Sequence, residues 1–252
     1  MSELFDAATV GEMVGRDFRT AAVFEQFGID FCCGGRRSLA DACRAAAVDP
    51  ATVERALQAL PPAGGGDEDD VTRWPVERLI DHIVTTHHTY IRSALPVISR
   101  YLAKLVDVHS TLHPELGRIA TSFDQVGREL LQHLMKEEHV LFPYIRELAA
   151  TTDGRAPASP FGTVENPIRM MEREHRDAGD ELRLIRELTN GYAVPSDGCT
   201  TYRVCFEELA LFERDLHRHV HLENNVLFPK AVALERGVTA PNEWRREETI
   251  HA

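Results

Sequence analysis

Apolar residues recur every three or four positions along four long stretches of the chain, which is the spacing of one face of an α-helix. The stretches cover approximately residues 75–108, 114–149, 164–189 and 199–235. Helices joined by short loops usually bury their apolar faces against one another, so we predict an antiparallel four-helix bundle over residues 73–236. The inward stripe of the first helix comprises Ile80, Ile83, Val84, Ile91, Leu95, Ile98, Leu102 and Leu105.

The first 60 residues carry shorter apolar runs between residues that start or stop helices. Thr9 is suited to cap a helix, and Gly28 is suited to end one. Ser38 and Asp49 precede two further helical patterns. We therefore expect a small helical domain over residues 1–60 and an all-α fold for the whole chain. A domain of this size is near the lower limit for a self-sufficient core, so docking or formation of a homodimer is expected to support it.

The composition changes sharply between these two predicted domains. Two prolines are followed by Gly64–Gly66 and then by four consecutive acidic residues. Glycine-rich segments behave as flexible chains, so residues 61–72 are predicted to form a flexible acidic linker. Residues 237–252 are interpreted as a tail.

A short motif occurs twice in the predicted bundle. The segment 132–143 returns as 218–229, with its histidine, glutamate and Leu-Phe-Pro in register at an offset of 86 residues. A repeat at a fixed offset indicates a duplicated structural unit. Residues four positions apart lie on one helix face, so each histidine and its glutamate can bind one ion together. The pairs are His133 with Glu137, and His219 with Glu223.

Neighbouring polar residues are poorer candidates for the same ion. Glu138 lies about 100° further round the helix than Glu137, so we expect its replacement to change little. His217 and His221 each lie about 200° from His219, on the far side of their helix.

The remaining two helices must complete any two-metal site. His175 lies at the centre of the apolar stripe of the third helix. On the first helix, His87 and His88 straddle the stripe, and spacing alone leaves both possible. His88 precedes His175 by nearly the repeat offset, which favours it and leaves His87 and His82 beside the site or on the surface.

The resulting donor set contains four imidazoles, two carboxylates and no thiolate. Such a set disfavours structural zinc and suits iron or manganese. If both glutamates bridge two ions, each ion has two imidazoles and two carboxylate oxygens. A bridging oxide or hydroxide would make five ligands and leave an open position on each ion for dioxygen, nitric oxide, peroxide or water. The set is His88, His133, Glu137, His175, His219 and Glu223.

These motifs together resemble a known family over nearly the whole chain. They are Cys32–Gly35, Ile80-Asp81-His82 with His88, His133-x-x-x-Glu137, Glu174-His175 and His219-x-x-x-Glu223-Asn224-Asn225. The combination is similar to the hemerythrin-like HHE family and, more narrowly, to the repair-of-iron-centres (RIC) di-iron proteins. The resemblance implies that the four histidines are terminal iron ligands and the two glutamates are bridges. His87, His217 and His221 depart from the family pattern.

The resemblance also implies a function. Proteins of this family are implicated in restoring iron–sulfur clusters damaged by nitric oxide or oxidative stress, by releasing iron. A nitric oxide reductase activity has also been proposed for them. We expect iron–sulfur proteins as partners of this chain, and two iron ions with a bridging oxide or hydroxide as its cofactor.

Two adjacent cysteines occur in the small N-terminal domain. Cys32 and Cys33 are followed by two glycines, which expose backbone, and by the cationic Arg36 and Arg37. Positive charge lowers the pKa of a thiol, so we interpret the two cysteines as an exposed thiol pair for iron transfer. The other three cysteines are expected to be packing residues: Cys43, Cys199 and Cys205.

Composition limits the cellular compartments and the classes of partner that we expect for this chain. A formal net charge of −12 argues against nucleic acids and anionic membranes as partners. The sequence has no 18-residue apolar run and no secretory signal, and its five cysteines are a poor disulfide framework. We therefore expect a cytoplasmic protein.

Three functions are compatible with this sequence. The chain could deliver iron to damaged clusters, act as a di-iron reductase of nitric oxide or peroxide, or sense dioxygen or nitric oxide by binding it. The thiol pair favours iron delivery, because a catalyst or sensor with its site inside the bundle has no obvious need of it. The sequence does not identify the cluster proteins concerned.

Overall fold

The computed structural model describes residues 8–61, 70–151 and 157–237. Helices dominate these residues, and the only strand-like pairing among them is an isolated bridge between Thr9 and Ser38. The predicted all-α fold is therefore confirmed. No helix in the described ranges is long and apolar enough to cross a membrane.

The chain divides into two compact units, each built from segments that are distant in sequence. The first unit comprises Met1–Asp81, Tyr144–Glu165 and Val220–Ala252, and the second comprises His82–Pro143 and Asn166–His219. These units do not follow the domain division predicted from the sequence, which stays a prediction.

Two predicted segments fall largely outside the described residues. Gly64–Gly66 and most of the proposed linker belong to the undescribed range 62–69. At the end of that range Asp70 caps a short 3-10 helix, η1 (Val71–Arg73), so the last residues assigned to the linker are helical. The tail, from residue 238, is also outside the described residues.

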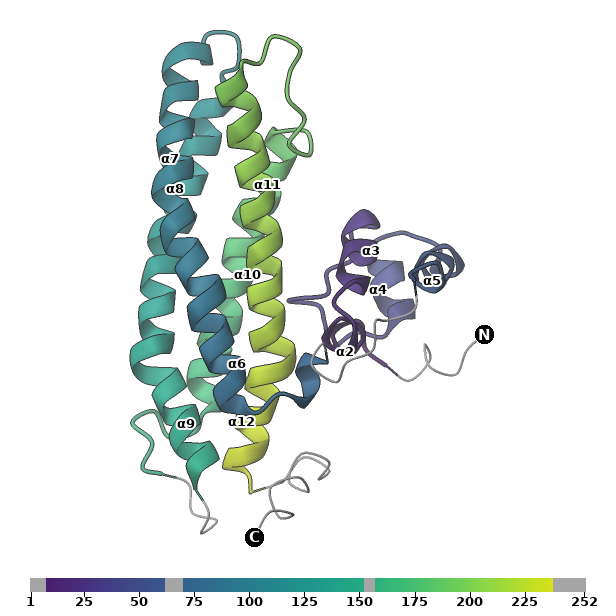
Figure 1. Cartoon of the computed structure of the whole chain (residues 1–252), viewed down its shortest axis with the longest axis vertical. Helices are drawn as coiled ribbons and strands as arrows, with labels where there is room; N and C mark the ends of the chain where they lie inside the picture. Colours follow the sequence, from purple (N-terminus) through teal and green to yellow (C-terminus); the bar gives the residue numbers. More distant parts are fainter. Residues whose placement is uncertain (1–7, 62–69, 152–156, 238–252) are drawn as a thin grey trace. The chain divides into compact units, whose positions relative to one another are not determined.

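A bundle of four helices makes up most of the second unit. These helices are α7 (Thr89–His109), α8 (Glu115–Lys136), α10 (Glu165–Leu188) and α11 (Thr200–His221). Short loops join α7 to α8 and α10 to α11, so sequence neighbours run in opposite directions (Figure 1). Their inward faces are apolar and buried, as in Ile91, Ile98, Ile119, Phe123, Leu182, Ile185, Leu209 and Phe212. This arrangement is the predicted antiparallel four-helix bundle.

Three π-helical turns interrupt the long helices, which the sequence pattern did not predict. They are η2 (Ile83–His88), η3 (Glu137–Leu141) and η4 (Leu222–Leu227). A π turn accommodates one extra residue and is often found at functional sites. The helices continue beyond these turns, with α6 (Val76–His82) before η2, α9 (Phe142–Ala150) after η3 and α12 (Phe228–Glu235) after η4.

Proline accounts for two of these turns. Pro143 and Pro229 each follow a π turn by two residues. A proline inside a regular α-helix lacks the N–H donor, and its ring clashes with the carbonyl four residues earlier. A locally widened turn relieves this clash, so the repeated Phe-Pro explains the position of η3 and η4. The turn η2 has no proline at the equivalent place.

The N-terminal helices begin and end where the sequence predicted. Thr9 caps α2 (Val10–Arg16), and its hydroxyl accepts from the Glu12 N–H while the Glu12 carboxylate accepts from the Thr9 N–H. After α3 (Thr20–Gln26), Gly28 has a φ of 65°, a conformation that favours glycine. Ser38 caps α4 (Leu39–Ala45), and Asp49 caps α5 (Pro50–Gln58).

Asn225 of η4 ties these N-terminal helices to the rest of the first unit. Its side-chain amide donates hydrogen bonds to the carbonyl oxygens of Phe31 (3.2 Å) and Cys32 (2.9 Å). A Cβ added at Gly35 would lie 2.3 Å from Asn225 Oδ1, and one at Gly11 would lie 2.8 Å from Asn225 Cγ. The Asn225 side chain therefore occupies space that only glycine leaves open.

We expect a Gly35→Ala variant to be destabilised by about 1–3 kcal/mol, because the added methyl group overlaps the Asn225 amide. Gly35 does not have a positive φ, so alanine introduces no backbone strain. Asn225→Ala should cost about 1–3 kcal/mol by leaving the two carbonyls without this donor. In the double variant the clash is absent, so the two costs should be clearly less than additive in urea unfolding. Strict additivity would show that the two residues are not in contact.

Candidate metal centre

Six ionisable side chains are buried in the core of the structure. Four of them are histidines, one from each of the four helical segments. The other two are glutamates, and each lies one helical turn after one of the histidines. None of the six is more than 2% exposed. Burial of so many polar groups is unfavourable unless hydrogen bonds or a cation compensate for it. They are the six residues predicted from the sequence: His88, His133, Glu137, His175, His219 and Glu223.

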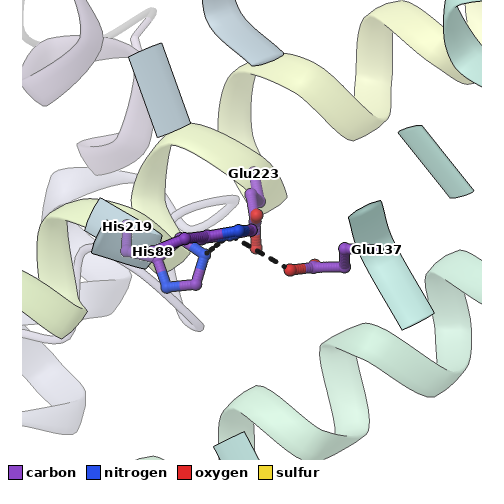
Figure 2. Close-up of side chains that lie close together, drawn as sticks. All are labelled: His88, Glu137, His219 and Glu223. Carbon is purple, nitrogen blue, oxygen red and sulfur yellow. Dashed lines mark hydrogen bonds and ion pairs between the residues drawn. The ribbon is translucent and has the colours of Figure 1, made fainter. Parts of the chain in front are cut away.

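The structure brings these side chains together as two overlapping groups. Ligand atoms of His88, Glu137, His219 and Glu223 lie within 4.8 Å of one another, and their side chains converge in Figure 2. The second group has the same spacing and the same two glutamates. Both carboxylates are thus common to two potential ion sites, as expected for bridging ligands. The members of the second group are His133, Glu137, His175 and Glu223.

The contacts between ligand atoms match the size of a metal ion. The Nε2 atoms of His88 and His219 are 3.2 Å apart, and those of His133 and His175 are 3.0 Å apart. Two ligands bound at about 2.1 Å and at right angles would be separated by about 3 Å.

The carboxylate of Glu137 faces both groups. Its Oε2 lies 3.4 Å from His88 Nε2, and its Oε1 lies 3.1 Å from His133 Nε2. One oxygen is therefore directed to each group, which is the disposition of a carboxylate that bridges two ions. The donor set of imidazole and carboxylate, without thiolate, fits iron or manganese.

Two further glutamates, which lie outside the two groups, accept hydrogen bonds from the histidine rings. The Nδ1–H of His88 donates to Glu138 Oε1 (2.6 Å), which also accepts from Arg92 (2.9 Å). Such a bond fixes the proton on Nδ1 and leaves the Nε2 lone pair directed inward. Burial alone would raise the pKa of Glu138, but its hydrogen bonds with Arg92 and His88 lower it.

The second outer glutamate is Glu174 of α10. Its Oε2 accepts from His133 Nδ1–H at 2.8 Å, and its other oxygen accepts from Lys136. Together, mainly through the His133 bond, these contacts lower the pKa of Glu174 to about 2 although burial opposes them.

Neither glutamate was assigned a role from the sequence. The expectation that replacing Glu138 changes little is untested, and the bond between Glu138 and His88 argues against it. Helical periodicity correctly directs Glu138 away from Glu137. It cannot reveal that His88, on another helix, approaches Glu138 from that side.

The additional histidines lie outside the two groups. His87 is buried, and its Nδ1 lies 3.0 Å from Asp215 Oδ1. Its ring stacks on that of His219 with centroids 6.0 Å apart. His82 packs edge-on against His87.

His221 faces the N-terminal helices. It is fully buried and packs edge-on against Phe18 and Phe31, and burial lowers its pKa to about 4. The position of His221, on the opposite side of the helix from His219, agrees with helical spacing.

The environment of the thiol pair differs from the one predicted. Cys32 is only 8% exposed, and Cys33 is half-buried. The pKa of Cys32 is raised well above its usual range by the neighbouring Cys33 thiol, by burial and by the Asp30 carboxylate. The expected lowering of the thiol pKa by Arg36 and Arg37 was therefore wrong for Cys32.

Asp30 joins the two cysteines in a third small cluster. Its Oδ1 accepts from the backbone N–H groups of Cys32 (3.1 Å) and Cys33 (2.9 Å), and it lies 3.3 Å from Cys32 Sγ. Ligand atoms of the three residues lie within 4.8 Å of one another, close enough to hold a metal ion.

Of the three cysteines predicted to be packing residues, two are buried and one is not. Cys43 and Cys205 are buried, and burial raises the pKa of both. Cys199 is exposed, so the packing role predicted for it was wrong.

Comparison with known proteins identifies the family. Residues 79–231 match the hemerythrin HHE cation binding domain, and residues 6–61 match a domain of unknown function (DUF542). The chain is 36% identical to the iron–sulfur cluster repair protein YtfE of Dickeya chrysanthemi over 227 residues, which cover 89% of this chain and 96% of the relative. It is 33% identical to YtfE of Escherichia coli, with 90% and 97% covered. The chain therefore belongs to the hemerythrin HHE cation-binding family, and within it to the YtfE family of iron–sulfur cluster repair proteins.

Proposed function

We propose that this chain is a di-iron protein that helps to repair iron–sulfur clusters damaged by nitric oxide or oxidants, by supplying iron. The observation that carries the proposal is the pair of buried His₂Glu₂ groups that share both glutamates. The names of its relatives support the same role. Damaged iron–sulfur proteins would be its partners.

The donor set is suited to iron that must be released again. In this assignment His88 and His219 bind one ion, His133 and His175 bind the other, and the two glutamates bridge. A bridging oxide or hydroxide would complete the centre. Ferritin-like bundles use more carboxylates, which compensate the ionic charge more fully. When bound, the two ions would supply Lewis-acid and redox chemistry towards small ligands such as nitric oxide, dioxygen or peroxide.

The protein's own contribution is to fix the orientation and tautomer of two of the four imidazoles. Glu138 and Glu174 accept the Nδ1 protons of His88 and His133. The bonds from His133 and Lys136 lower the pKa of Glu174, and those from Arg92 and His88 lower the pKa of Glu138. The Nε2 lone pairs of His88 and His133 are therefore directed inward, where a cation could bind.

The thiol pair would receive iron on its way to a damaged cluster. Six nitrogen and oxygen donors bind iron but offer no soft ligand for transfer to a thiolate-bound cluster, whereas Cys32 and Cys33 do. Their protons would leave as the ion arrives, since thiols bind metals as thiolates. Asn225, two residues after Glu223 in η4, donates to the Cys32 carbonyl and so anchors the thiol loop to the turn that carries this glutamate.

Alternative functions would use the same buried groups. A nitric oxide or peroxide reductase would show steady-state turnover, and a sensor would bind its ligand reversibly without iron loss. The cluster of Cys32, Cys33 and Asp30 favours iron delivery, because neither alternative requires it. The five free cysteines agree with a reducing compartment, and we propose the cytoplasm. Formation of a homodimer stays a proposal.

Glu137→Ala should reduce bound iron from two ions to one or none, because it removes a ligand from both groups. Iron content after anaerobic reconstitution and the absorption of an oxo-bridged centre in air would measure this. Glu129→Ala is the matched control, since Glu129 is an exposed residue of α8, the helix that leads into η3. Two tightly bound ions in Glu137→Ala would exclude Glu137 as a bridge.

Glu138→Ala and Glu174→Ala should each weaken iron binding by roughly 10–100-fold, because His88 and His133 lose the carboxylates that orient them. The stoichiometry at saturating iron should stay at two. Competition with a chelator of known affinity would report the change. Affinities equal to that of the parent protein would mean that the imidazoles are oriented without these carboxylates.

A Cys32→Ser, Cys33→Ser double variant should retain its iron and its spectrum but reactivate a damaged [4Fe–4S] enzyme more slowly than the parent. The reason is that serine keeps the size of the side chain while removing the soft donor. Cys43→Ser, in the same N-terminal region, is the control for a buried cysteine outside the cluster. Reactivation at the parent rate would place the thiols outside the path of iron.

A further inference from the structure

A separate cluster of reactive side chains lies where α7 ends and α11 begins, at one end of the bundle (Figure 1). It contains the last residue of α7, His109, and Cys199, which directly precedes the first residue of α11. Both belong to the second compact unit. Cys199 and His219 are about 30 Å apart along the axis of α11, so this cluster is distinct from the metal centre.

Cys199 has the surroundings of a nucleophilic thiol. It is exposed, and its Sγ lies 3.4 Å from His109 Nε2. The hydrogen bond with His109, followed by backbone N–H groups of Tyr202 and Thr201 in the first turn of α11, lowers the pKa of Cys199 to about 7. A thiol and a base within hydrogen-bond reach are the two parts of an activated cysteine nucleophile.

The imidazole of His109 is held in place by its neighbours. Its ring packs edge-on against Tyr202, with centroids 5.5 Å apart, and lies 6.5 Å from the ring of His113. His113 also packs on Tyr202 and is fixed by Asp197 (3.1 Å) and Glu115 (3.2 Å). Tyr202 is buried, so it provides a rigid surface for both histidines.

The other cysteines lack this combination of exposure and base. Cys205 lies on the same helix but is buried, with its pKa raised to about 12. Cys32 and Cys43 are also buried. Cys33 is half-buried beside Cys32 and Asp30.

We propose that Cys199 and His109 form a surface site that undergoes thiol–disulfide exchange with small disulfides. The Cys199 thiolate attacks one sulfur of the disulfide, whose S–S bond breaks as a new bond forms to Sγ. The departing thiolate takes the proton that His109 removed from Cys199. One thiol and one disulfide give one mixed disulfide and one small thiol, so the small disulfide is the oxidant and Cys199 is reversibly capped.

The test is exchange with 2-hydroxyethyl disulfide, a neutral probe, on the iron-loaded full-length protein. Mass spectrometry of peptides after acid quenching would give the rate at each cysteine between pH 5 and pH 10. Cys199 should be modified first, with a rate midpoint near pH 7, and Cys205 should stay unmodified. Cys199→Ser should abolish the fast phase, and a small thiol should reverse the modification.

His109→Leu distinguishes an activated thiol from a merely exposed one. The midpoint should move towards the ordinary value of about 8.5, and the rate at pH 7 should fall about three- to sixfold, because lost thiolate outweighs increased nucleophilicity. At pH 10 the variant should react at least as fast as the parent. His113→Leu should move the midpoint less than His109→Leu, since His113 packs beside His109 but bonds to Asp197 and Glu115 rather than to the thiol.

Iron content and the unfolding midpoint would be measured for each variant to confirm an intact fold, and His109→Gln provides a second substitution at the same position. Two results would overturn the proposal. One is a Cys199 rate no faster than that of Cys33. The other is a pH profile of the Cys199 rate that stays unchanged in both His109→Leu and His109→Gln.

Discussion

The structure depends on keeping two carboxylates and four imidazoles together in an apolar core. Two carboxylates that share a dry site repel each other, and each loses the hydration that stabilises its charge. The imidazoles compensate for this repulsion and lost hydration only in part, because each offers one inward nitrogen. Cations bound by these residues would remove the repulsion and accept the inward lone pairs. Metal binding and folding of this core are therefore expected to be coupled.

The outer carboxylates are part of the same electrostatic arrangement. Glu138 and Glu174 each accept one hydrogen bond from an inner imidazole and a second from a cationic side chain. These hydrogen bonds lower the pKa of both outer glutamates although burial opposes them, and the bond from each imidazole fixes the tautomer that a metal requires.

Much of the fold and of the inner site could be predicted from the sequence, because both follow from regular spacing. The offset of 86 residues aligned Glu137 with Glu223, and capping residues such as Thr9 and Ser38 marked helix starts. The π turns escaped prediction, although Pro143 inside a helical pattern was a usable signal for one of them.

Contacts between helices that are distant in sequence were beyond this kind of reasoning. Periodicity states which way a side chain leaves its own helix, but not what approaches it. Glu138 bonds to His88 of η2, which lies 50 residues earlier in the sequence. Cys199 bonds to His109, which lies 90 residues earlier. The error about Cys32 has a different origin, because Cys33 and Asp30, which lie even closer to it in sequence than Arg36 and Arg37, are the groups that act on its thiol.

The two kinds of cysteine illustrate how charge decides what a thiol can do. Around Cys32, a second thiol, burial and a carboxylate all favour the protonated form, so Cys32 is a poor nucleophile without a cation. A metal ion reverses this, because the same carboxylate and both thiolates then stabilise the ion. Around Cys199, an imidazole and the start of a helix favour the thiolate without any metal. Cys32 and Cys33 are therefore suited to bind a transferred ion, whereas Cys199 is suited to react covalently.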